Sequence, residues 1–281
     1  MIATGSEPAT PPIPGADLPG VLDSTGLLEL RGEIMKDFVI IGGGVIGIEF
    51  ATIYSDLGTN VTVVEAMDRL LPNMDKELGR SLKMNFKNRG IDTHTNAMVE
   101  KIEERKGRLV CFYKEKDKVQ EVEADHILVC TGRRPVTKGV FSEELLGARG
   151  FLQVDECYRT EIPSIYGIGD AIGGTMLAHT ATAEGRNAVA IMNGKEPEIN
   201  MNVVAGCIYT SPEIASVGLT QDEAKEAGID VITKKFPTSA NGKTIIEELD
   251  RGFIKLVASK EDHTLLGAQL MCGRATDIIG E

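Results

Sequence analysis

Apolar and polar positions alternate along the chain in a pattern that predicts a βαβ unit near its beginning. Residues Phe38–Ile41 form a continuous apolar run, which is typical of a strand buried on both faces. A helix with small and apolar residues on one face is expected over residues 48–57, with Gly58 as its C-terminal cap. The β-branched run at residues 61–65 completes the unit as a second strand.

The rest of the chain shows two further kinds of pattern. An amphipathic helix over residues 75–89 is followed by four expected strands, at 99–102, 108–114, 119–123 and 126–131. A strand that ends at Gly169-Asp170 and a helix over 180–193 come next. After residue 202 the pattern predicts an antiparallel sheet, with strands at 207–210, 231–236, 252–259 and 265–271 and a helix over 221–227. We therefore predict an α/β fold with a Rossmann-like domain and a C-terminal α+β domain.

The two ends of the chain do not resemble the beginning and the end of a domain. Residues 1–32 are rich in proline and glycine and are predicted to be a loop or linker. The last residues, ATDIIGE, are predicted to begin a helix that has no C-terminal cap. From the sequence we expect an internal piece of a longer protein.

Composition narrows the class of function. Lys and Arg number 30 and Asp and Glu number 42, and the net charge of −12 argues against binding to nucleic acid or anionic membrane. The chain has no run of 18 apolar residues and no signal-peptide pattern, so a cytoplasmic protein is expected. The five cysteines form no CxxC or CxxxxC pair. A disulfide framework, a zinc site and a local redox dithiol are therefore not predicted.

A glycine-rich turn between the two strands of the βαβ unit predicts a dinucleotide site. In the motif GGGVIG, Gly42 permits a tight turn, Gly44 lets the backbone approach a pyrophosphate, and Gly47 lets the helix pack on the strand. The free N–H groups at the helix N-terminus favour phosphate. Glu65 closes the second strand, where a carboxylate binds the adenosine 2′-hydroxyl and repels a 2′-phosphate. This favours NAD over NADP, and Arg69 is expected to be a solvated surface charge.

Six stretches, in the same order along the chain, resemble the pyridine nucleotide–disulfide oxidoreductases, which are flavoproteins that bind two dinucleotides. They are IATGSEP, IIGGGVIGIEFA, VTVVEAMDRLLPNMD, CTGRRP, VDECYRTEIPSIYGIGDAIGGTMLAHTATAEG and YTSPEIASVGLTQDEAKEAG. The resemblance implies an NAD-binding domain over residues 33–150, inserted between parts of an FAD-binding domain at 1–32 and 151–200. Residues 201–281 would then form a truncated interface domain that makes a homodimer.

The resemblance also implies which residues hold the two cofactors. The NAD pyrophosphate and nicotinamide would lie along residues Gly42, Gly43, Gly44, Val45, Ile46, Gly47, Ile48 and Glu49. Glu65 would bind the adenosine ribose, Val99 would contact the adenine and Gly132 the nicotinamide end. The FAD would contact Thr4, Gly5, Ser6, Asp170, Met176, Leu177, Ala178 and His179.

Simpler structural roles are open for several of these residues. Glu49 can be a helix-surface glutamate, Val99 a core residue, and Asp170 the cap of a turn. His179 and Glu184 are five residues apart, but they lie in the stretch expected to face the flavin. We do not predict them to be a catalytic pair.

Within the family, the chain most resembles the members that oxidise dihydrolipoamide and reduce NAD through FAD and a redox disulfide. The implied substrate is dihydrolipoamide on the carrier domains of 2-oxo acid dehydrogenase complexes. The chain has one GxGxxG motif, no CxxxxC disulfide and no C-terminal histidine–glutamate pair. We therefore predict no catalytic residue and no metal site in this chain, and expect it to be inactive alone and not to retain FAD.

Two alternatives stay open from the sequence. One is another disulfide reductase, of the glutathione, mercuric or transhydrogenase type, although Glu65 counts against the members that use NADP. The other is a non-catalytic module that binds a dinucleotide and dimerises. The stretches that match FAD-binding segments count against such a module, because they would have no purpose there.

Overall fold

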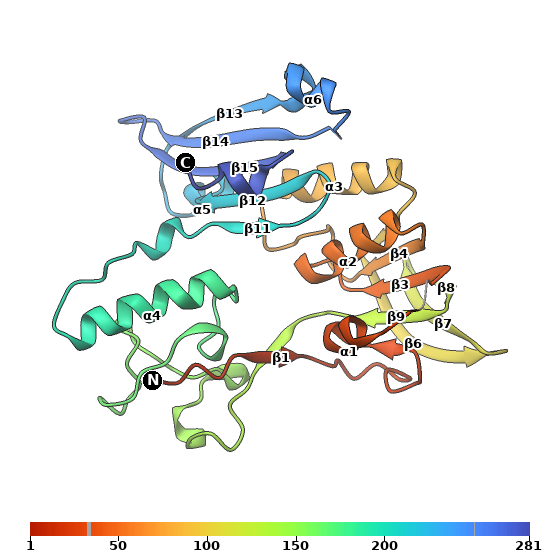
Figure 1. Cartoon of the computed structure of the whole chain (residues 1–281), viewed down its shortest axis with the longest axis horizontal. Coiled ribbons are helices and arrows are strands. Elements are labelled where there is room, and N and C mark those ends of the chain that lie inside the picture. The colour runs from red at the N-terminus through yellow and green to blue at the C-terminus, as the bar shows by residue number, and fades with distance from the viewer. Residues whose placement is uncertain (33–34, 250) are drawn as a thin grey trace. The chain divides into compact units, whose positions relative to one another are not determined.

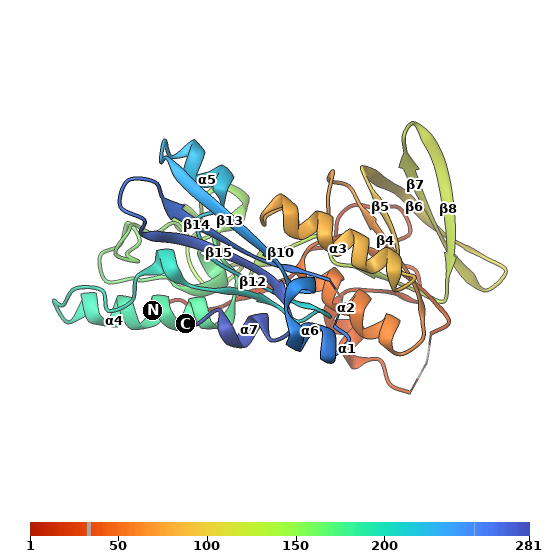
Figure 2. The ribbon, with the colours of Figure 1, turned by 90° about the horizontal axis from the view of Figure 1, so that it is seen from above.

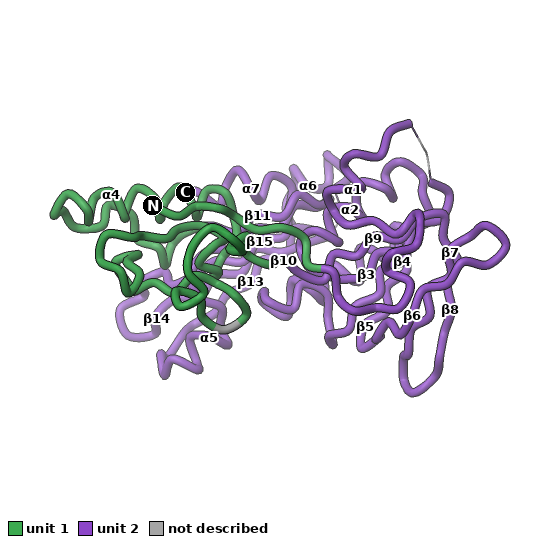
Figure 3. Tube along the Cα trace, turned by 90° about the horizontal axis from the view of Figure 1, so that it is seen from below, with its two compact units in different colours: residues 1–9, 133–204 green, residues 10–132, 205–281 purple. Residues whose placement is uncertain are grey.

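The computed structural model describes residues 1–32, 35–249 and 251–281. It divides into two compact units, coloured separately in Figure 3. The smaller unit consists of residues 1–9 and 133–204, and the larger unit of residues 10–132 and 205–281. Both units are therefore built from two separate stretches of the chain. Among the described residues, no helix is long and apolar enough to cross a membrane.

A five-stranded parallel sheet forms the centre of the larger unit (Figure 1). Its strands, in spatial order, are β2 (Val21–Leu22), β9 (His126–Val129), β3 (Asp37–Ile41), β4 (Asn60–Glu65) and β5 (Asp92–Thr95). From β3 the chain proceeds to β4 and β5 on one side, and β9 is later added on the other side. The strand order thus reverses at β3, and in open α/β sheets ligands bind at the carboxyl ends of strands beside such a switch point.

Helices cover one face of this sheet. They are α1 (Ser24–Glu29), α2 (Val45–Asp56) and α3 (Lys76–Asn88). In α3, Leu78, Leu82 and Phe86 recur every four residues and are all fully buried, as expected of an amphipathic helix. They share one core with Phe38 and Ile40 of β3. Because successive strand residues point to opposite faces, Val39 and Ile41 face the other way.

The other face is covered by a three-stranded antiparallel sheet of β6 (Ala97–Arg105), β7 (Arg108–Glu115) and β8 (Lys118–Ala124). Val39 and Ile41 pack there against Cys111 and Tyr113 of β7 in a second core. The parallel sheet is therefore buried on both faces, which explains why β3 is apolar without alternation.

The C-terminal part of the larger unit is a second five-stranded sheet, and all of its strands pair antiparallel. In spatial order they are β11 (Gly206–Ile208), β12 (Glu213–Gly218), β15 (Leu265–Cys272), β14 (Phe253–Ser259) and β13 (Val231–Pro237). Three short helices accompany it, α5 (Gln221–Glu226), α6 (Gly242–Ile246) and α7 (Ala275–Ile278). Helix α3 lies between this sheet and the parallel sheet in two perpendicular views (Figures 1 and 2). Phe253 and Met271 accordingly belong to the same core as the α3 leucines.

The smaller unit is held together by short elements. Strand β1 (Ser6–Pro8) pairs antiparallel with β10 (Arg133–Pro135). Its long helix is α4 (Ala178–Met192), which follows the 3₁₀ turn η3 (Gly169–Ala171). Three other 3₁₀ turns are η1 (Glu143–Leu145), η2 (Ala148–Gly150) and η4 (Met201–Val203), and η5 (Thr238–Ala240) belongs to the larger unit.

The structure differs from the sequence-based expectations in several places, among them the unexpected short elements β10 and α6. Residues 1–32, predicted as a loop or linker, contain β1, α1 and β2, which are too short to give a periodic pattern. Strand β5 was not expected because its residues are polar, and β12 was not expected because it is rich in small residues. The expected strand before Gly169-Asp170 forms isolated bridges at Tyr166 and Gly167 instead.

Candidate functional site

The glycine-rich turn connects β3 to α2, and each of its glycines meets a different requirement. Gly42 has φ of +119° and donates its N–H to Val64 O. A Cβ atom on Gly47 would lie 2.1 Å from Gly42 O, so a larger residue would separate the helix from the turn. At Gly44 a Cβ would meet nothing within 4 Å. Gly44 is the N-cap of α2 and supplies no side-chain cap, which leaves space and N–H groups for an anion.

Glu65 lies at the end of β4, directly beside this turn. Its Oε2 accepts the N–H of Gly43, and its Oε1 accepts the N–H of Met67 at 2.6 Å. The residue is only 7% exposed. Two backbone hydrogen bonds thus hold a buried carboxylate at the sheet edge where the glycine turn opens.

Arg69 follows in the same loop, and local partners hold its guanidinium. It pairs with Asp68 at 3.2 Å and donates a hydrogen bond to Pro72 O at 2.9 Å. The side chain is about one-third exposed. Its charge is therefore partly compensated within the loop, as expected of a residue with a local role.

The first turn of α2 presents residues of contrasting burial. Ile48 is fully buried in the core, whereas Val45 is exposed and Ile46 and Glu49 are half-buried. Burial raises the pKa of the Glu49 carboxyl, and a hydrogen bond from the Tyr209 N–H partly opposes this rise. The Glu49 carboxyl is therefore held by the segment that directly follows β11.

Val99 and Gly132, predicted at the adenine and nicotinamide ends of the NAD, lie on different segments of the larger unit. Val99, on β6, is half-buried and packs against the second core. Just before β6, the Asn96 N–H donates to Met67 O, so this connection adjoins the loop after Glu65. Gly132 follows β9, and the Cys130 carbonyl lies 2.7 Å from where a Cβ on Gly42 would stand. Gly132 thus follows a strand of the parallel sheet beside the glycine turn, whereas Val99 belongs to the three-stranded antiparallel sheet.

In the smaller unit, Ser6 and Asp170 are in direct contact although 164 residues separate them. The Ser6 hydroxyl donates to Asp170 Oδ2 at 2.5 Å and accepts the Nε–H of Arg133 at 2.6 Å. Gly5, with φ of +73°, accepts a hydrogen bond from the Val136 N–H. Thr4, next to it, is exposed. Arg133 lies in the CTGRRP stretch but is not among the residues predicted from the sequence.

The segment 176–179 leads into helix α4. Met176 and Leu177 are half-buried, and Ala178 and His179 are exposed. Leu177 is the N-cap of α4 and gives the helix no side-chain cap. Further along α4, the buried Glu184 accepts the Gly169 N–H at 2.6 Å and so fixes the turn that carries Asp170. Glu184 is thus a positioning residue for this turn, which sequence reasoning had considered only as a catalytic partner.

The thiols of the described residues carry no sign of reactivity. All five cysteines are free. Burial raises the pKa of Cys111 to about 12, and it raises that of Cys130, beside Glu65, to about 12 as well. Such thiols stay protonated and are poor nucleophiles. Within the described parts of the chain, no group of three or more His, Cys, Asp or Glu could hold a metal ion.

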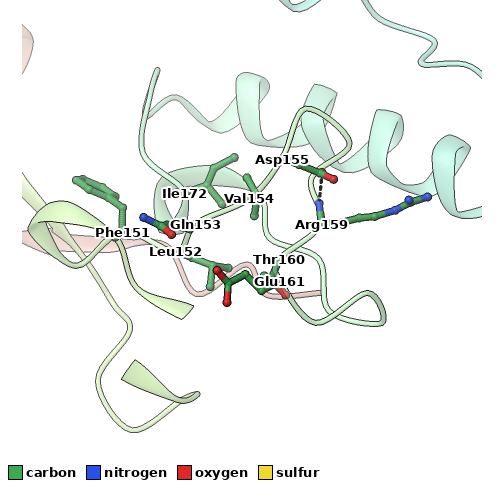
Figure 4. Close-up of a pocket in the computed structure, with 10 residues that line it drawn as sticks. Phe151, Leu152, Gln153, Val154, Asp155, Arg159, Thr160, Glu161 and Ile172 are labelled. Atoms are coloured by element: carbon green, nitrogen blue, oxygen red, sulfur yellow. Dashed lines mark hydrogen bonds between the residues drawn. The ribbon is translucent and has the colours of Figure 1, made fainter. Parts of the chain in front are cut away.

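A cavity of about 700 Å³ opens in the smaller unit (Figure 4). Leu152, Val154 and Ile172 give it an apolar side, and Asp155, which accepts the Arg159 N–H at 2.8 Å, lies at its rim. None of the residues predicted to bind NAD or FAD lines it. This cavity is therefore separate from the candidate cofactor residues.

Comparison with known proteins identifies the family of this chain. Residues 1–185 match the family model described as pyridine nucleotide-disulphide oxidoreductase, and residues 204–281 match the dimerisation domain of the same family. Dihydrolipoyl dehydrogenase of Geobacillus stearothermophilus is 38% identical over 285 residues, which cover all of this chain and 60% of that protein. The chain thus spans about 60% of the length of this curated relative.

Solved structures of similar proteins superpose on this chain over nearly its whole length. The HOCl-induced flavoprotein disulfide reductase RclA from Escherichia coli, in its Cu(II) complex, superposes with a TM-score of 0.90 at 29% identity, covering 99% of this chain and 65% of that one. LpdA from Mycobacterium tuberculosis superposes with a TM-score of 0.88 at 29% identity, covering 99% and 60%. Family models, relatives and structures point to the same group of flavoproteins, whose members bind FAD and a nicotinamide nucleotide. The chain belongs to the pyridine nucleotide-disulphide oxidoreductase family.

Proposed function

We propose that this chain is the NAD-binding and dimerisation region of a flavoprotein of the dihydrolipoyl dehydrogenase type. The geometry of Glu65 is the observation that supports NAD over NADP. Its carboxylate is buried and held by the N–H groups of Gly43 and Met67, and each oxygen keeps a lone pair for a ribose hydroxyl. A 2′-phosphate would bring a second negative charge to the same desolvated place, which is costly. The site therefore favours NAD over NADP.

The rest of the NAD would extend from Glu65 across the glycine turn. The pyrophosphate fits the open space at Gly44 and the N–H groups of the first turn of α2. Val99 lies toward the adenine end, and Gly132 lies toward the nicotinamide end on the β9 side. In this arrangement the dinucleotide crosses the switch point of the parallel sheet, with one half on each side of β3.

FAD is the second cofactor of this proposal, and the smaller unit offers residues that fit it. Asp170 would bind ribityl or pyrophosphate groups of FAD. Its carboxylate accepts a hydrogen bond from Ser6, and its turn is held by the hydrogen bond from the Gly169 N–H to Glu184. Thr4 and Gly5 directly precede Ser6, which donates to this carboxylate, and the uncapped N-terminus of α4 at residues 176–179 would face the ring. The chemistry that FAD supplies in such proteins is two-electron transfer between a dithiol and a nicotinamide.

For the whole protein we propose oxidation of dihydrolipoamide with reduction of NAD, in a homodimer. The relatives at 38% identity are dihydrolipoyl dehydrogenases, and a dimerisation-domain model matches residues 204–281. We assign residues 33–150 to the NAD domain and residues 201–281 to the interface domain. The resemblance gives residues 1–32 and 151–200 to the FAD domain, but residues 10–32 lie in the larger unit and pair with its parallel sheet through β2, so we assign only residues 1–9 and 151–200 to the FAD domain. Dihydrolipoamide on the carriers of 2-oxo acid dehydrogenase complexes is the proposed partner substrate.

The choice of NAD is tested by titrating the chain with NADH and NADPH. We expect the dissociation constant of NADH to be lower by about tenfold or more, since an uncompensated buried charge costs at least 1.4 kcal/mol or so. Glu65→Gln should bring the two affinities within about threefold, because the negative charge is gone. The exposed Glu104 gives a matched control, Glu104→Gln, with unchanged preference. Equal affinities in the unchanged chain would contradict the role of Glu65, and tighter binding of NADPH would favour an NADP-linked disulfide reductase.

Dimerisation is tested separately, by analytical ultracentrifugation at micromolar concentrations. We expect a self-associating species, because residues 204–281 match the family's dimerisation domain. A strictly monomeric profile up to about 100 μM would contradict the dimer for this chain, since specific homodimers associate well below that concentration. Addition of NADH should leave the association unchanged, which separates the two parts of the proposal.

A further inference from the structure

Gly43 lies in the middle of the glycine-rich turn, and space rather than backbone conformation requires a glycine there. Gly42, which precedes it, has φ of +119°, whereas Gly43 is not among the glycines with positive φ. Alanine would therefore fit the backbone of Gly43 without strain. A Cβ atom on Gly43, however, would lie 2.8 Å from Leu70 Cδ2 and 3.0 Å from both Cβ and Oε2 of Glu65. A methyl group at this position would thus collide with the carboxylate and with the loop that follows it.

The backbone at Gly43 is fixed and has no room to retreat from such a collision. Its carbonyl accepts the N–H of Leu71 at 2.9 Å. Gly42 donates its N–H to Val64 O, also at 2.9 Å. On the other side of the turn, the Cys130 carbonyl lies 2.7 Å from where a Cβ on Gly42 would stand. Contacts from β4, from the loop after it and from the residue after β9 thus hold the turn in place.

Of the two side chains that meet this position, Leu70 is the more tightly packed. It is fully buried, and its carbonyl lies 2.2 Å from where a Cβ on Gly79 of α3 would stand. Helix α3 therefore packs closely against the backbone of this loop. The Glu65 carboxylate is the end of a flexible side chain, held by the N–H groups of Gly43 and Met67. A methyl group on Gly43 would therefore displace the carboxylate of Glu65.

We propose that Gly43 is a specificity-determining residue, because its lack of a side chain lets the Glu65 carboxylate lie directly on the turn. This inference rests on the proposed NAD site. The Gly43 N–H donates to Glu65 Oε2, so the residue that leaves the space also supplies the hydrogen bond. This bond fixes the negative charge at the end of β4, where a ribose 2′-hydroxyl would bind and a 2′-phosphate would be repelled. Gly43 therefore positions the charge that Glu65 supplies.

Gly43→Ala tests this role through the ratio of two dissociation constants. NADH and NADPH are titrated by calorimetry against the unchanged chain and against G43A. A displaced carboxylate is no longer fixed at the ribose, so we expect the NADH dissociation constant to rise about threefold and that of NADPH to stay nearly the same. The preference for NADH should therefore fall about threefold. Gly26→Ala on α1 is the matched control and should leave both values unchanged, because a Cβ there would meet its nearest neighbours at 3.6 Å.

The same substitution in a Glu65→Gln background separates the charge of the site from its shape. The amide of E65Q has nearly the size of the carboxylate, so the collision remains while the charge is gone. We therefore expect G43A/E65Q to have the same ratio of NADH and NADPH dissociation constants as E65Q, within about twofold. If G43A lowers the melting temperature strongly, the ratio is compared between Leu70→Val and G43A/L70V. Valine has no δ carbon to meet the methyl group, whereas the contacts with Glu65 at 3.0 Å remain.

The ratio of dissociation constants decides the outcome. A selective loss of NADH affinity in G43A that is absent in the E65Q background supports the proposal. Equal losses for NADH and NADPH, or no loss at all, would overturn it and leave Gly43 with a packing role alone. A selective loss that persists in the E65Q background would also overturn it, because the charge of Glu65 would then have no part in the effect. Equal affinities of the unchanged chain for the two nucleotides would instead reject the proposed preference for NAD on which the inference rests.

Discussion

At the scale of single residues, Glu184 is an acid placed where its charge is poorly solvated. It is buried on α4 and accepts one hydrogen bond, from the Gly169 N–H. Burial raises the pKa of its carboxyl, the Gly169 N–H partly lowers it, and the neighbouring Asp170 raises it further. Glu184 therefore fixes the turn that carries Asp170, and its protonation makes the free energy of unfolding depend on pH.

We predict that Glu184→Gln flattens part of the pH dependence of stability. The folded-state pKa of Glu184 lies above its unfolded value, so the folded state binds more protons between the two. Stability from this group is present below the ordinary glutamate range and is lost as pH rises through the raised pKa. The amide still accepts the Gly169 N–H, whereas Glu184→Ala should lose about 1–3 kcal/mol. Urea unfolding from about pH 4 to about pH 7 measures the stability of both variants and of the unchanged chain. If the stability of E184Q depends on pH in the same way as that of the unchanged chain, the prediction is wrong.

At the scale of elements, the β3–α2–β4 unit is the part that local sequence specifies best. The predicted strands at 38–41 and 61–65 each begin one residue later than in the structure. Helix α2 begins at Val45, three residues before the expected start, because the glycine motif itself provides its N-cap. Strand β12 was not predicted, because many of its side chains are small and its partner β15 comes from a distant segment of the chain.

The glycines of this unit give a matched pair of predictions. Gly47→Ala should destabilise the chain by about 1–3 kcal/mol, because its Cβ would collide with the Gly42 carbonyl, 2.1 Å away. Gly44→Ala meets nothing within 4 Å and should change stability by only about 0.5 kcal/mol or less. It nevertheless fills the space proposed for the pyrophosphate, so NADH affinity should fall by about tenfold or more.

Thermal melting and NADH titration of both variants are the measurements. A Gly44→Ala chain that binds NADH normally would argue against the proposed path of the pyrophosphate. That result would not bear on the predicted destabilisation by Gly47→Ala, because that prediction concerns packing alone.

At the scale of the whole larger unit, a buried ion pair joins α3 to the C-terminal sheet. Lys255 of β14 is 3% exposed and donates to Asp75 and Glu77, both at 2.8 Å. Asp75 is 6% exposed and also caps α3 by accepting the Glu77 N–H. Burial raises the pKa of Glu77, but hydrogen bonds from Lys235 and Lys255 outweigh it and lower the pKa to about 2.

We predict that Lys255→Met destabilises the chain by about 3–5 kcal/mol, since it leaves the Asp75 carboxylate buried without its cation. The double variant D75N/K255M should recover most of this loss, because neither partner is then charged. Lys235→Met, at the exposed edge of the cluster, is the control and should cost about 1 kcal/mol or less. Guanidinium unfolding measures all three.

The same cluster gives acid sensitivity with a defined sign. The folded-state pKa of Glu77 lies below the ordinary value, so its stabilisation is present above pH 4.5 and is lost as pH falls toward about 2. Lys235→Met should weaken this acid dependence. Acid profiles that stay the same in that variant would argue that Glu77 is not coupled to Lys235.

The amino-acid sequence by itself determined the glycine turn, the strand–helix–strand unit around it and the position of Glu65. These depend on backbone conformation and on short periods of hydrophobicity, which neighbouring residues encode locally. Only the tertiary structure decided the partners of the chemical groups: Ser6 with Asp170, Glu49 with the Tyr209 N–H, and Lys255 with Asp75, which are 164, 160 and 180 residues apart. Such groups come together only when elements distant in sequence pack against each other. Local sequence patterns do not predict which of these elements will be in contact. Lys255 illustrates this, because a lysine in an alternating strand is expected in solvent until a carboxylate on another element meets it in the core.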